Sequence, residues 1–202
     1  MRKFFRGAPP DFLHKHWQTW GERYATNRAN NPGFVFQWPQ IKRKKISTLL
    51  LPLLAKLTDG HCSYCDNFPL RSRESSIDHF RPKSKPEYYQ EVCRWENLYM
   101  CCPNCQQHKL EQYNEFLLRP DDEHYSFDEY FIYSFTTNEI LPNPAASELS
   151  QQKARTTIDV FGLNDQGHPT ARRHNLERYQ AKAGEGNTID VNDFPYRYTL
   201  LE

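Results

Sequence analysis

Two short segments, HCSYC at residues 61–65 and CCPNC at residues 101–105, each contain a Cys-x-x-Cys pair. Two such pairs supply four thiolates at a spacing typical of a tetrahedral zinc site. The four candidate ligands are Cys62, Cys65, Cys102 and Cys105. Because four thiolates fill the coordination sphere and leave no position for water, we expect this zinc to be structural.

The two pairs lie further apart than in an ordinary zinc ribbon. There are 36 residues between Cys65 and Cys102, against roughly 15 to 20 in the usual four-cysteine pattern. A further unit is therefore inserted between the two halves of the zinc site. The remaining cysteines are Cys93 and Cys101. Cys101 could compete with Cys102 as a ligand, although the Cys102 register matches the first pair.

The composition predicts one core with appendages. The chain has 202 residues, of which 38% are hydrophobic and 14% aromatic, and its mean hydropathy is −0.88. We expect a small, irregular core built on aromatic rings. The formal net charge of +1 gives no overall attraction to nucleic acid, so any phosphate binding must come from local patches.

Neither export nor membrane insertion is expected. The first residues, MRKFFRGAPPDF, lack the apolar run of a secretory signal. The most apolar stretch, residues 49–57, is about half the length that a bilayer crossing needs, and Pro52 interrupts it. In a reducing cytoplasm, cysteines serve as metal ligands more readily than as disulfides. We therefore expect a cytoplasmic protein with no membrane partner.

Local patterns predict a mixed α and β chain. Helices are predicted within residues 14–24, 42–60, 105–118, 144–162 and 168–184, and a hairpin within residues 130–141. The basic run Lys42–Lys45 is interpreted as a solvated helix face in preference to a nucleic-acid contact. The leucines that follow it are interpreted as core in preference to a partner groove.

These elements divide the chain into four parts. They are an aromatic and helical N-terminal extension (1–58), a central unit with the cysteine pairs (59–120), a hairpin with a helical C-terminal region (121–184) and a tail (185–202). The tail is expected either to be loose or to bind a partner as a strand.

The inserted unit contains IDHFRPKS at residues 77–84. On a strand, the neighbouring side chains of Asp78 and His79 point to opposite faces, so they must have different tasks. Asp78 suits a hard divalent cation such as Mg2+ or Mn2+, and His79 can deprotonate water at cellular pH. Arg81 and Lys83 can grip flanking phosphates. Because a lone Asp-His pair is more often a satisfied histidine, this interpretation depends on the neighbouring motifs.

Those motifs resemble the HNH endonuclease family. WENL at residues 95–98 precedes the second cysteine pair, and residues 62–109 follow the order of zinc-bearing members: a cysteine pair, Asp-His, Asn-Leu and a second cysteine pair. The resemblance implies an α+β fold with a ββα-metal finger, braced by the four-cysteine zinc site and flanked by largely helical N-terminal and C-terminal extensions. It implies that Asp78 is a catalytic metal ligand, His79 the general base and Asn97 the residue that pins the loop holding His79.

One position departs from the family pattern. Members usually carry His or Asn immediately after the last cysteine as the second ligand of the catalytic cation, and this chain has Gln106 there. His108 follows two residues later, and Lys109 matches the usual Lys, which is interpreted as a further phosphate contact. Gln106 is favoured as the ligand by register, with His108 as the alternative.

The wording of IDHFRPKS, WENL and CPNCQQHK, together with TTIDVFGLN at residues 156–164, is most similar to the PtuB-like branch of HNH nucleases, found in Septu and retron antiphage systems. The similarity covers the central half of the chain well and the C-terminal helices loosely. It implies an antiphage effector that cuts DNA, RNA or tRNA and acts with an ABC-type ATPase partner of the PtuA type.

A rival hypothesis from another class is a catalytically inactive, zinc-braced module that binds nucleic acid or a partner. Gln106 keeps that hypothesis open, because its amide replaces the usual ligand. A purely structural zinc adaptor is a third interpretation, which the family spacing of Asp78, His79 and Asn97 disfavours.

Overall fold

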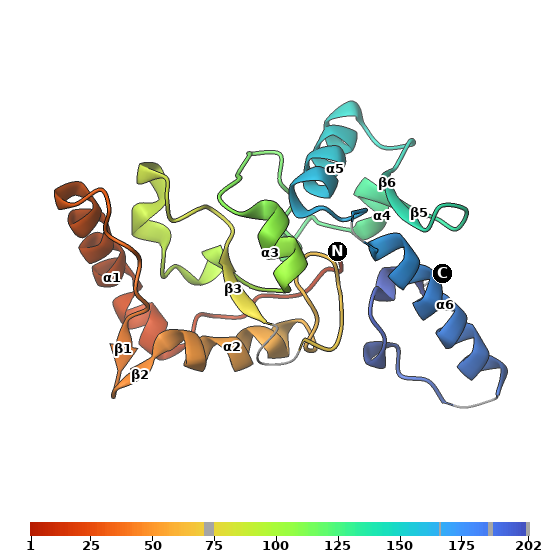
Figure 1. Cartoon of the computed structure of the whole chain (residues 1–202), viewed down its shortest axis with the longest axis horizontal. Coiled ribbons are helices and arrows are strands. Elements are labelled where there is room, and N and C mark those ends of the chain that lie inside the picture. The colour runs from red at the N-terminus through yellow and green to blue at the C-terminus, as the bar shows by residue number, and fades with distance from the viewer. Residues whose placement is uncertain (71–74, 166, 186–187, 201–202) are drawn as a thin grey trace.

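The computed structural model describes residues 1–70, 75–165, 167–185 and 188–200. The molecule is elongated: helix α1 (Asp11–Asn30) lies at one end and α6 (His168–Gly184) at the other, with β3 (Ser76–His79) and α3 (Pro103–Lys109) between them (Figure 1). No helix among the described residues is long and apolar enough to cross a membrane.

The described part of the chain is α+β, with helices and three antiparallel two-stranded sheets. The other helices are α2 (Ile46–Leu57), α4 (Phe127–Tyr130) and α5 (Glu148–Phe161). The other strands are β1 (Gln40–Ile41), β2 (Lys44–Lys45), β4 (Leu98–Cys101), β5 (Phe131–Ser134) and β6 (Glu139–Pro142). Short 3-10 turns cover Pro86–Glu91, Trp95–Asn97, Val191–Asp193 and Arg197–Thr199.

Helix α1 is longer than the predicted helix at 14–24 because it packs along the 3-10 turn Pro86–Glu91. Gly21 permits this approach: a Cβ there would lie 2.1 Å from the backbone oxygen of Gln90. Glycine normally weakens a helix interior. Here its missing side chain lets two backbones touch.

The basic run Lys42–Lys45 is a hairpin, and the prediction of a helix face was wrong. Strand β1 pairs with β2 so that Ile41 faces Lys44, which leaves Lys42 and Arg43 as the two turn residues. Both have left-handed backbones, with φ of 48° and 64°. Such turns favour Asn-Gly, and a side chain in this conformation costs about 1 to 3 kcal/mol per residue. Helix α2 begins only at Ile46.

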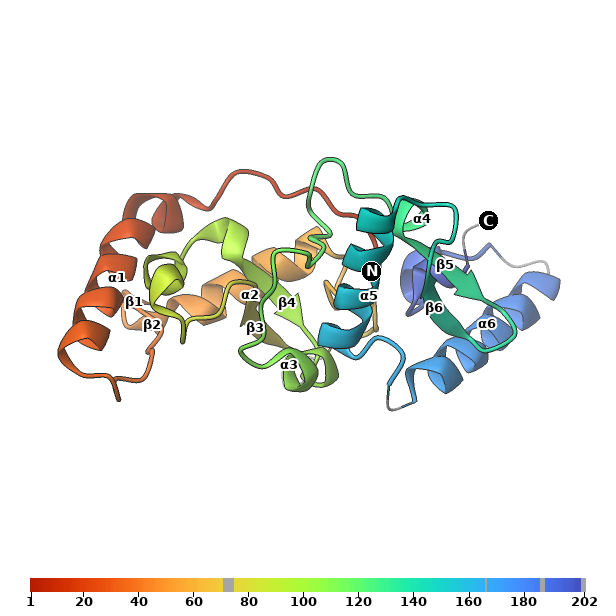
Figure 2. The same ribbon diagram turned by 90° about the horizontal axis from the view of Figure 1, so that it is seen from above.

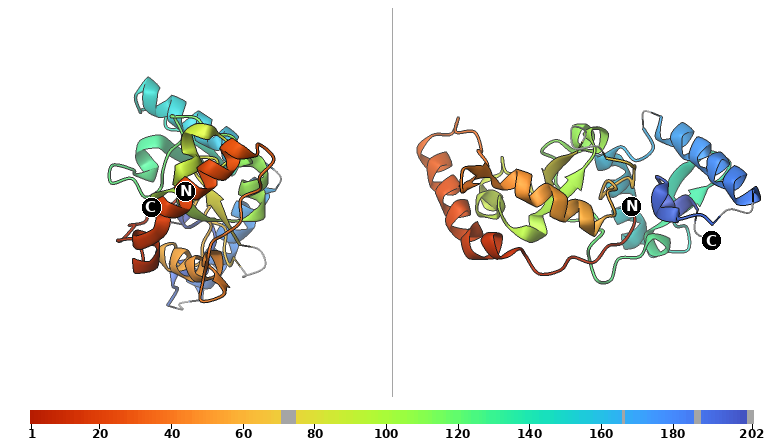
Figure 3. Two further views of the ribbon diagram at one scale, coloured as in Figure 1. Left: turned by 90° about the vertical axis from the view of Figure 1, so that its left-hand side faces the viewer. Right: turned by 90° about the horizontal axis from the view of Figure 1, so that it is seen from below.

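The central hairpin carries the Asp-His pair. Strand β3 pairs with β4 so that Asp78 faces Tyr99 and His79 faces Leu98. Seen from above, β3, β4 and α3 form the middle of the molecule (Figure 2), and from below α2 lies across the central strands (Figure 3). The helix predicted at 105–118 is shorter in the structure, because Leu110 takes a left-handed φ of 46° and ends α3.

The core forms two clusters, of which the first is rich in aromatic side chains, as the composition predicts, and the second is mainly aliphatic. One cluster surrounds the cysteines and includes Tyr64, Tyr99 and Phe161. The other lies between α1, α2 and the central hairpin and includes Leu50 and Trp95. The strands β3 and β4 separate the two clusters, so each side of the central hairpin is buried.

The C-terminal elements follow the predicted order. Strands β5 and β6 form the predicted hairpin, and α5 ends at Gly162, whose φ of 58° gives the left-handed cap that glycine favours. The predicted tail 185–202 is neither loose nor a strand where it is described: residues 196–199 are buried in the core. Its residues 186–187 and 201–202 lie outside the described part.

Candidate functional site

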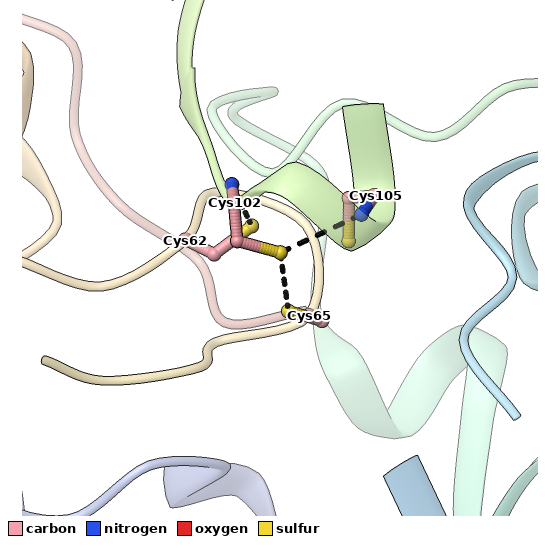
Figure 4. A group of neighbouring side chains, drawn as sticks. All are labelled: Cys62, Cys65, Cys102 and Cys105. Atoms are coloured by element: carbon pink, nitrogen blue, oxygen red, sulfur yellow. Dashed lines mark hydrogen bonds between the residues drawn. The ribbon is translucent and has the colours of Figure 1, made fainter. Parts of the chain in front are cut away.

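The four predicted zinc ligands meet in one buried cluster. The ligand atoms of Cys62, Cys65, Cys102 and Cys105 all lie within 4.8 Å of one another. The Sγ atoms of Cys65 and Cys102 are 3.6 Å apart (Figure 4). Tetrahedral zinc with Zn–S bonds near 2.3 Å places its sulfurs about 3.8 Å apart. The cluster therefore fits a structural metal ion.

The electrostatics of the cluster also suit a cation. Burial would raise the pKa of the Cys62 thiol, but hydrogen bonds from the neighbouring cysteines outweigh it and hold that pKa well below its ordinary value. Burial keeps the pKa of Cys65 well above its ordinary value. Hydrogen bonds with Cys102 and the other two cysteines, together with burial, do the same for the pKa of Cys105. A bound cation supplies positive charge that favours the thiolate form of such ligands, so metal binding and deprotonation are coupled.

The structure also decides the register of the second pair. The backbone amide of Cys105 lies 3.5 Å from the Cys102 Sγ, which caps the start of α3. Cys101 lies on β4, and its thiol donates to the backbone oxygen of Cys102 at 3.2 Å. Among the described residues, Cys93 and Cys101 do not belong to the four-ligand group.

A buried ion pair ties this cluster to the C-terminal segment. Asp66, directly after Cys65, accepts from the Arg197 Nη2 and backbone nitrogen, each at 2.7 Å. Arg197 also donates to the Asp59 carboxylate at 2.9 Å and to the backbone oxygen of Thr58 at 3.2 Å. The C-terminal segment is therefore part of the brace around the metal site.

The Asp-His pair borders a separate cavity. Asp78, His79, Lys83 and Gln106 line a space of about 140 Å3. Asp78 is backed by the Tyr64 hydroxyl, which donates to its Oδ2 at 2.8 Å. His79 turns toward the other core cluster, so the two side chains leave the strand in different directions, as a strand requires.

The His79 ring is fixed by three contacts. Its Nε2 donates to the backbone oxygen of Val92 at 3.0 Å. Trp38 stacks on the ring with centroids 5.4 Å apart and planes 19° apart, and Phe36 meets it edge-on at 5.4 Å. Because a carbonyl only accepts, Nε2 carries the hydrogen and Nδ1 keeps its lone pair. Burial lowers the pKa of His79 to about 3, so the ring is neutral at cellular pH.

Asn97 holds the loop that follows His79. Its Oδ1 accepts from the backbone nitrogen of Arg81 at 2.7 Å, and its Nδ2 donates to the backbone oxygens of Arg81 and Glu91, each at 3.1 Å. Both the oxygen and the nitrogen of this buried side-chain amide are thus hydrogen-bonded to backbone groups. Asn97 therefore links the backbone after His79 to that of Glu91.

The structure brings Gln106, and not His108, to the cavity. Gln106 Oε1 accepts a hydrogen bond from the Ser76 hydroxyl. His108 faces α5 instead: its Nδ1 lies 3.6 Å from the Asp165 carboxylate, and a Cβ at Gly162 would lie 2.5 Å from its ring. Of the two alternatives for the second ligand, the geometry favours Gln106.

Lys109 occupies a position different from the predicted one. Its side chain is fully buried, and its Nζ lies 2.7 Å from the backbone oxygen of His79 and 3.2 Å from Asp78 Oδ2. A fully buried ammonium with these partners does not reach a phosphate at the surface. Burial raises the pKa of Asp78, and the Lys109 charge and the Tyr64 hydroxyl reduce that rise. Lys109 therefore compensates the Asp78 charge.

The other two predicted phosphate contacts are partly exposed. Arg81 donates to Glu91 at 2.8 Å, and Lys83 lies 3.5 Å from Glu111. The Lys83 pair lies at the surface, where such pairs contribute little to stability, whereas Glu91 is only 19% exposed and accepts from Arg81 with both oxygens. Lys83 is therefore the more loosely held of the two cations.

Several residues of the site were missed in the sequence. Tyr64 lies inside the first cysteine pair, where its position beside two ligands was the available signal. Ser76 starts the Asp-His strand, two residues before Asp78. Trp38 and Phe36 lie about 40 residues upstream of His79 and carry no local signal of their contact with it.

Comparison with known proteins gives a partial match. No family model matches the chain. The Septu protein PtuB of Bacillus mycoides (strain KBAB4) is 31% identical over 72 residues, which cover 30% of this chain and 24% of that protein. The matched part is thus about a quarter of the relative's length. Over this part the chain is similar to a Septu protein.

Proposed function

We propose that this chain is a metal-dependent nuclease of the HNH type, in which β3, β4 and α3 form the ββα-metal finger. The observation that carries the proposal is the single cavity lined by Asp78, His79 and Gln106. A carboxylate and an amide oxygen are hard metal ligands and an imidazole is a base, which are the kinds of group that phosphodiester hydrolysis requires. Asn97, the fourth residue of the family pattern, holds the adjoining loop.

His79 acts as the general base. Its Nε2 is committed to the Val92 oxygen, and Nδ1 has no hydrogen-bond partner among the described residues. The neutral ring has a free Nδ1 lone pair, which accepts a proton from water without first losing one. Because burial lowers its pKa to about 3, the ring is a weak base until the negative charge of a bound phosphate raises that pKa. The stacked Trp38 ring and the Val92 oxygen keep that lone pair in one direction, which reduces the entropy lost in reaching the transition state.

Asp78 and Gln106 are the proposed ligands of Mg2+ or Mn2+. Carboxylate and amide oxygens suit these hard cations, which commonly use one or two carboxylates together with water and substrate phosphates. A bound divalent cation supplies the positive charge that stabilises the phosphate and the leaving oxygen in the transition state. Arg81 and Lys83, at the edge of the site, position the flanking phosphates.

We further propose that the chain serves in antiphage defence with an ABC-type ATPase partner. This proposal is supported by the partial similarity to the Septu protein PtuB and by the PtuB-like wording of the motifs. In such an arrangement the ATPase controls when the nuclease acts. The nuclease activity and the partner are separate parts of the proposal and are tested separately.

A second candidate is a zinc-braced binding module without chemistry. The observation that favours it is the Lys109 ammonium, 3.2 Å from Asp78, which occupies part of the carboxylate that a cation needs. On this hypothesis nucleic-acid or partner binding is independent of Mg2+ and of His79.

The test is cleavage of supercoiled plasmid and of total tRNA with Mg2+ or Mn2+, by the wild-type chain and by His79→Ala, alone and with any co-encoded ATPase. Loss of a general base lowers the rate by about 100-fold to 10,000-fold, so we expect cutting by the wild type and almost none by the variant. Equal cutting by both would remove His79 from the mechanism. No cutting by folded, zinc-loaded wild type under all conditions would favour the binding module.

A further inference from the structure

The near-zero net charge hides a strong separation of charge along the chain. Residues 1–58 contain 11 lysines and arginines against 2 aspartates and glutamates, a net charge of +9. Residues 121–202 contain 7 against 14, a net charge of −7. Helix α1 and the β1–β2 hairpin of the first group lie at one end of the molecule and α6 of the second group lies at the other, with β3 and β4 between them (Figures 1 and 2). Arg2, Lys3 and Arg6 of the first group lie elsewhere, in contact with residues 121, 123 and 192 of the second.

The densest part of the positive end is the hairpin Lys42–Lys45. All four side chains are exposed. Among the described residues, none of the four ammonium or guanidinium groups has an ion pair or hydrogen-bond partner, whereas Arg81, Lys83 and Arg94 each pair with a glutamate. Four adjacent unpaired cations repel one another, so their juxtaposition is unfavourable until an anion joins them.

The backbone of this hairpin strengthens the case. Lys42 and Arg43 hold left-handed conformations that Asn and Gly adopt at far lower cost. A sequence selected for stability alone places Asn-Gly in such a turn. The strained turn keeps two long cationic side chains at its tip, directed into solvent, where a ligand can reach them.

The hairpin is directly connected to the candidate active site. Trp38, whose ring stacks on His79, precedes Lys42 by four residues. Four extended residues span at most about 14 Å, and duplex DNA carries one phosphate per strand for about every 3.4 Å of its axis. A strand whose scissile phosphate lies at His79 therefore has further phosphates within reach of the hairpin, about four nucleotides away.

We propose that the Lys42–Lys45 hairpin is a phosphate-backbone contact for the nucleic-acid substrate, which enters over the α1 end of the molecule. The inference rests on the proposed nuclease function and adds the path of the substrate to it. Lysine and arginine side chains on a turn recognise the charge and spacing of the phosphates and do not distinguish the bases. The acidic α6 end repels the same polyanion and so orients it.

Binding is measured by the fluorescence anisotropy of a labelled DNA duplex and of a labelled single-stranded RNA. The full chain carries His79→Ala, so that cleavage does not consume the probe. The test variant also carries Lys42→Gln, Arg43→Gln and Lys44→Gln; Lys45 is kept because it is the N-cap residue of α2. The matched control loses three exposed cations of the acidic end. Its substitutions are Arg155→Gln, Arg173→Gln and Lys182→Gln.

Each phosphate contact adds about 0.9 to the slope of log K against log salt for duplex DNA. We expect the hairpin variant to lose about two to three from this slope, and the control variant to keep the wild-type slope. An unchanged slope in the hairpin variant would overturn the inference, and so would an equal loss in the control, because the effect would then be general charge.

A second variant separates binding from folding. Lys42→Asn with Arg43→Gly relieves the strained turn, so we expect a higher melting temperature together with a weaker salt dependence. If the cations instead bind an acidic protein surface, such as the α6 end of another copy, this variant dissociates a dimer in sedimentation while its salt slope stays unchanged, which overturns the inference.

The outcome is independent of the nuclease test. Cutting by the wild type with an unchanged slope in the hairpin variant would reject the substrate path and leave the nuclease intact. No cutting by the wild type with a reduced slope would reject the nuclease and leave a nucleic-acid contact at the hairpin.

Discussion

Asp66 and Asp78 are both buried and both face a cation, yet their surroundings differ. Asp66, 2% exposed, receives the forked guanidinium of Arg197 and its backbone nitrogen, which occupy both carboxylate oxygens. Asp78, 5% exposed, receives the hydroxyl of Tyr64 and the single ammonium of Lys109, which lies 3.2 Å from its Oδ2 and 3.3 Å from its Oδ1, and it borders a cavity.

The difference between the two cations determines what each carboxylate can still bind. A planar guanidinium matches both oxygens of a carboxylate and leaves little capacity for a ligand. A lysine ammonium is a compact point charge, and its contacts with the two Asp78 oxygens, at 3.2 and 3.3 Å, are longer than the 2.7 Å contacts of Arg197 with Asp66. Asp66 is therefore committed to holding the fold, while Asp78 keeps the capacity to bind a cation.

The largest expected effect on stability is that of losing the zinc held by the four cysteines next to Asp66. Cys62→Ser removes one of four ligands, and zinc binding in such sites contributes about 10 kcal/mol or more to folding, so we expect loss of both zinc and the folded state. The measurements are zinc content and thermal melting by circular dichroism. Cys93→Ser, at a buried cysteine outside the cluster, is the control and should keep its zinc. A Cys62→Ser protein that stays folded without zinc would refute the assignment.

Breaking the Arg197 pair is expected to rank next. Arg197→Met leaves the Asp66 charge buried without its partner, which costs about 3 to 5 kcal/mol of unfolding free energy. Urea unfolding measures this loss, and Asp66→Asn in the same chain should restore part of it. A loss below about 1 kcal/mol, the range of surface pairs, would show that this pair is not a brace.

Breaking the Lys109 pair should cost less stability. In Lys109→Met the Asp78 carboxylate keeps the Tyr64 hydroxyl and can draw water from its cavity, so we expect about 1 to 3 kcal/mol, the range for one lost buried hydrogen-bond partner. The same urea titration provides the number. A cost equal to that of Arg197→Met would remove the distinction between the two carboxylates.

The smallest expected effect concerns the ring that holds His79. Trp38→Ala frees the imidazole, and we expect kcat to fall about tenfold with KM unchanged, because orientation and not substrate binding is lost. Trp38→Phe keeps a stacking surface and should recover most of kcat. A matching rise in KM, or no recovery with Phe, would assign Trp38 to the substrate or to the fold alone.

The sequence predicted the features whose signal is local. The Cys62 and Cys65 spacing, the Asp78-His79 strand and the Gly162 helix end each depend on residues within a few positions of one another. A metal ligand, a strand or a left-handed helix cap can therefore be predicted from neighbouring residues alone. The four-cysteine cluster confirms that such spacing predicts a metal-binding group.

The rest depends on packing between distant segments. Nothing in the spacing of Asp66 indicates that Arg197, 131 residues later, neutralises it. Lys109 resembles a surface lysine in sequence, and only the close fit of α3 against β3 buries it. The early end of α3 likewise comes from the Leu110 backbone, since the residues beyond it continue a pattern that a longer helix would also satisfy.

The Asp66 pair also sets an order of events in synthesis. Ribosomes add about 5 to 20 residues per second, so Arg197 emerges roughly 10 seconds after the first cysteine pair. Until then the Asp66 carboxylate, directly after the first cysteine pair, lacks its guanidinium partner. We expect stalled chains that end before residue 190 to bind zinc more weakly than the full-length chain. A metal site braced this way is complete only after Arg197 has left the ribosome.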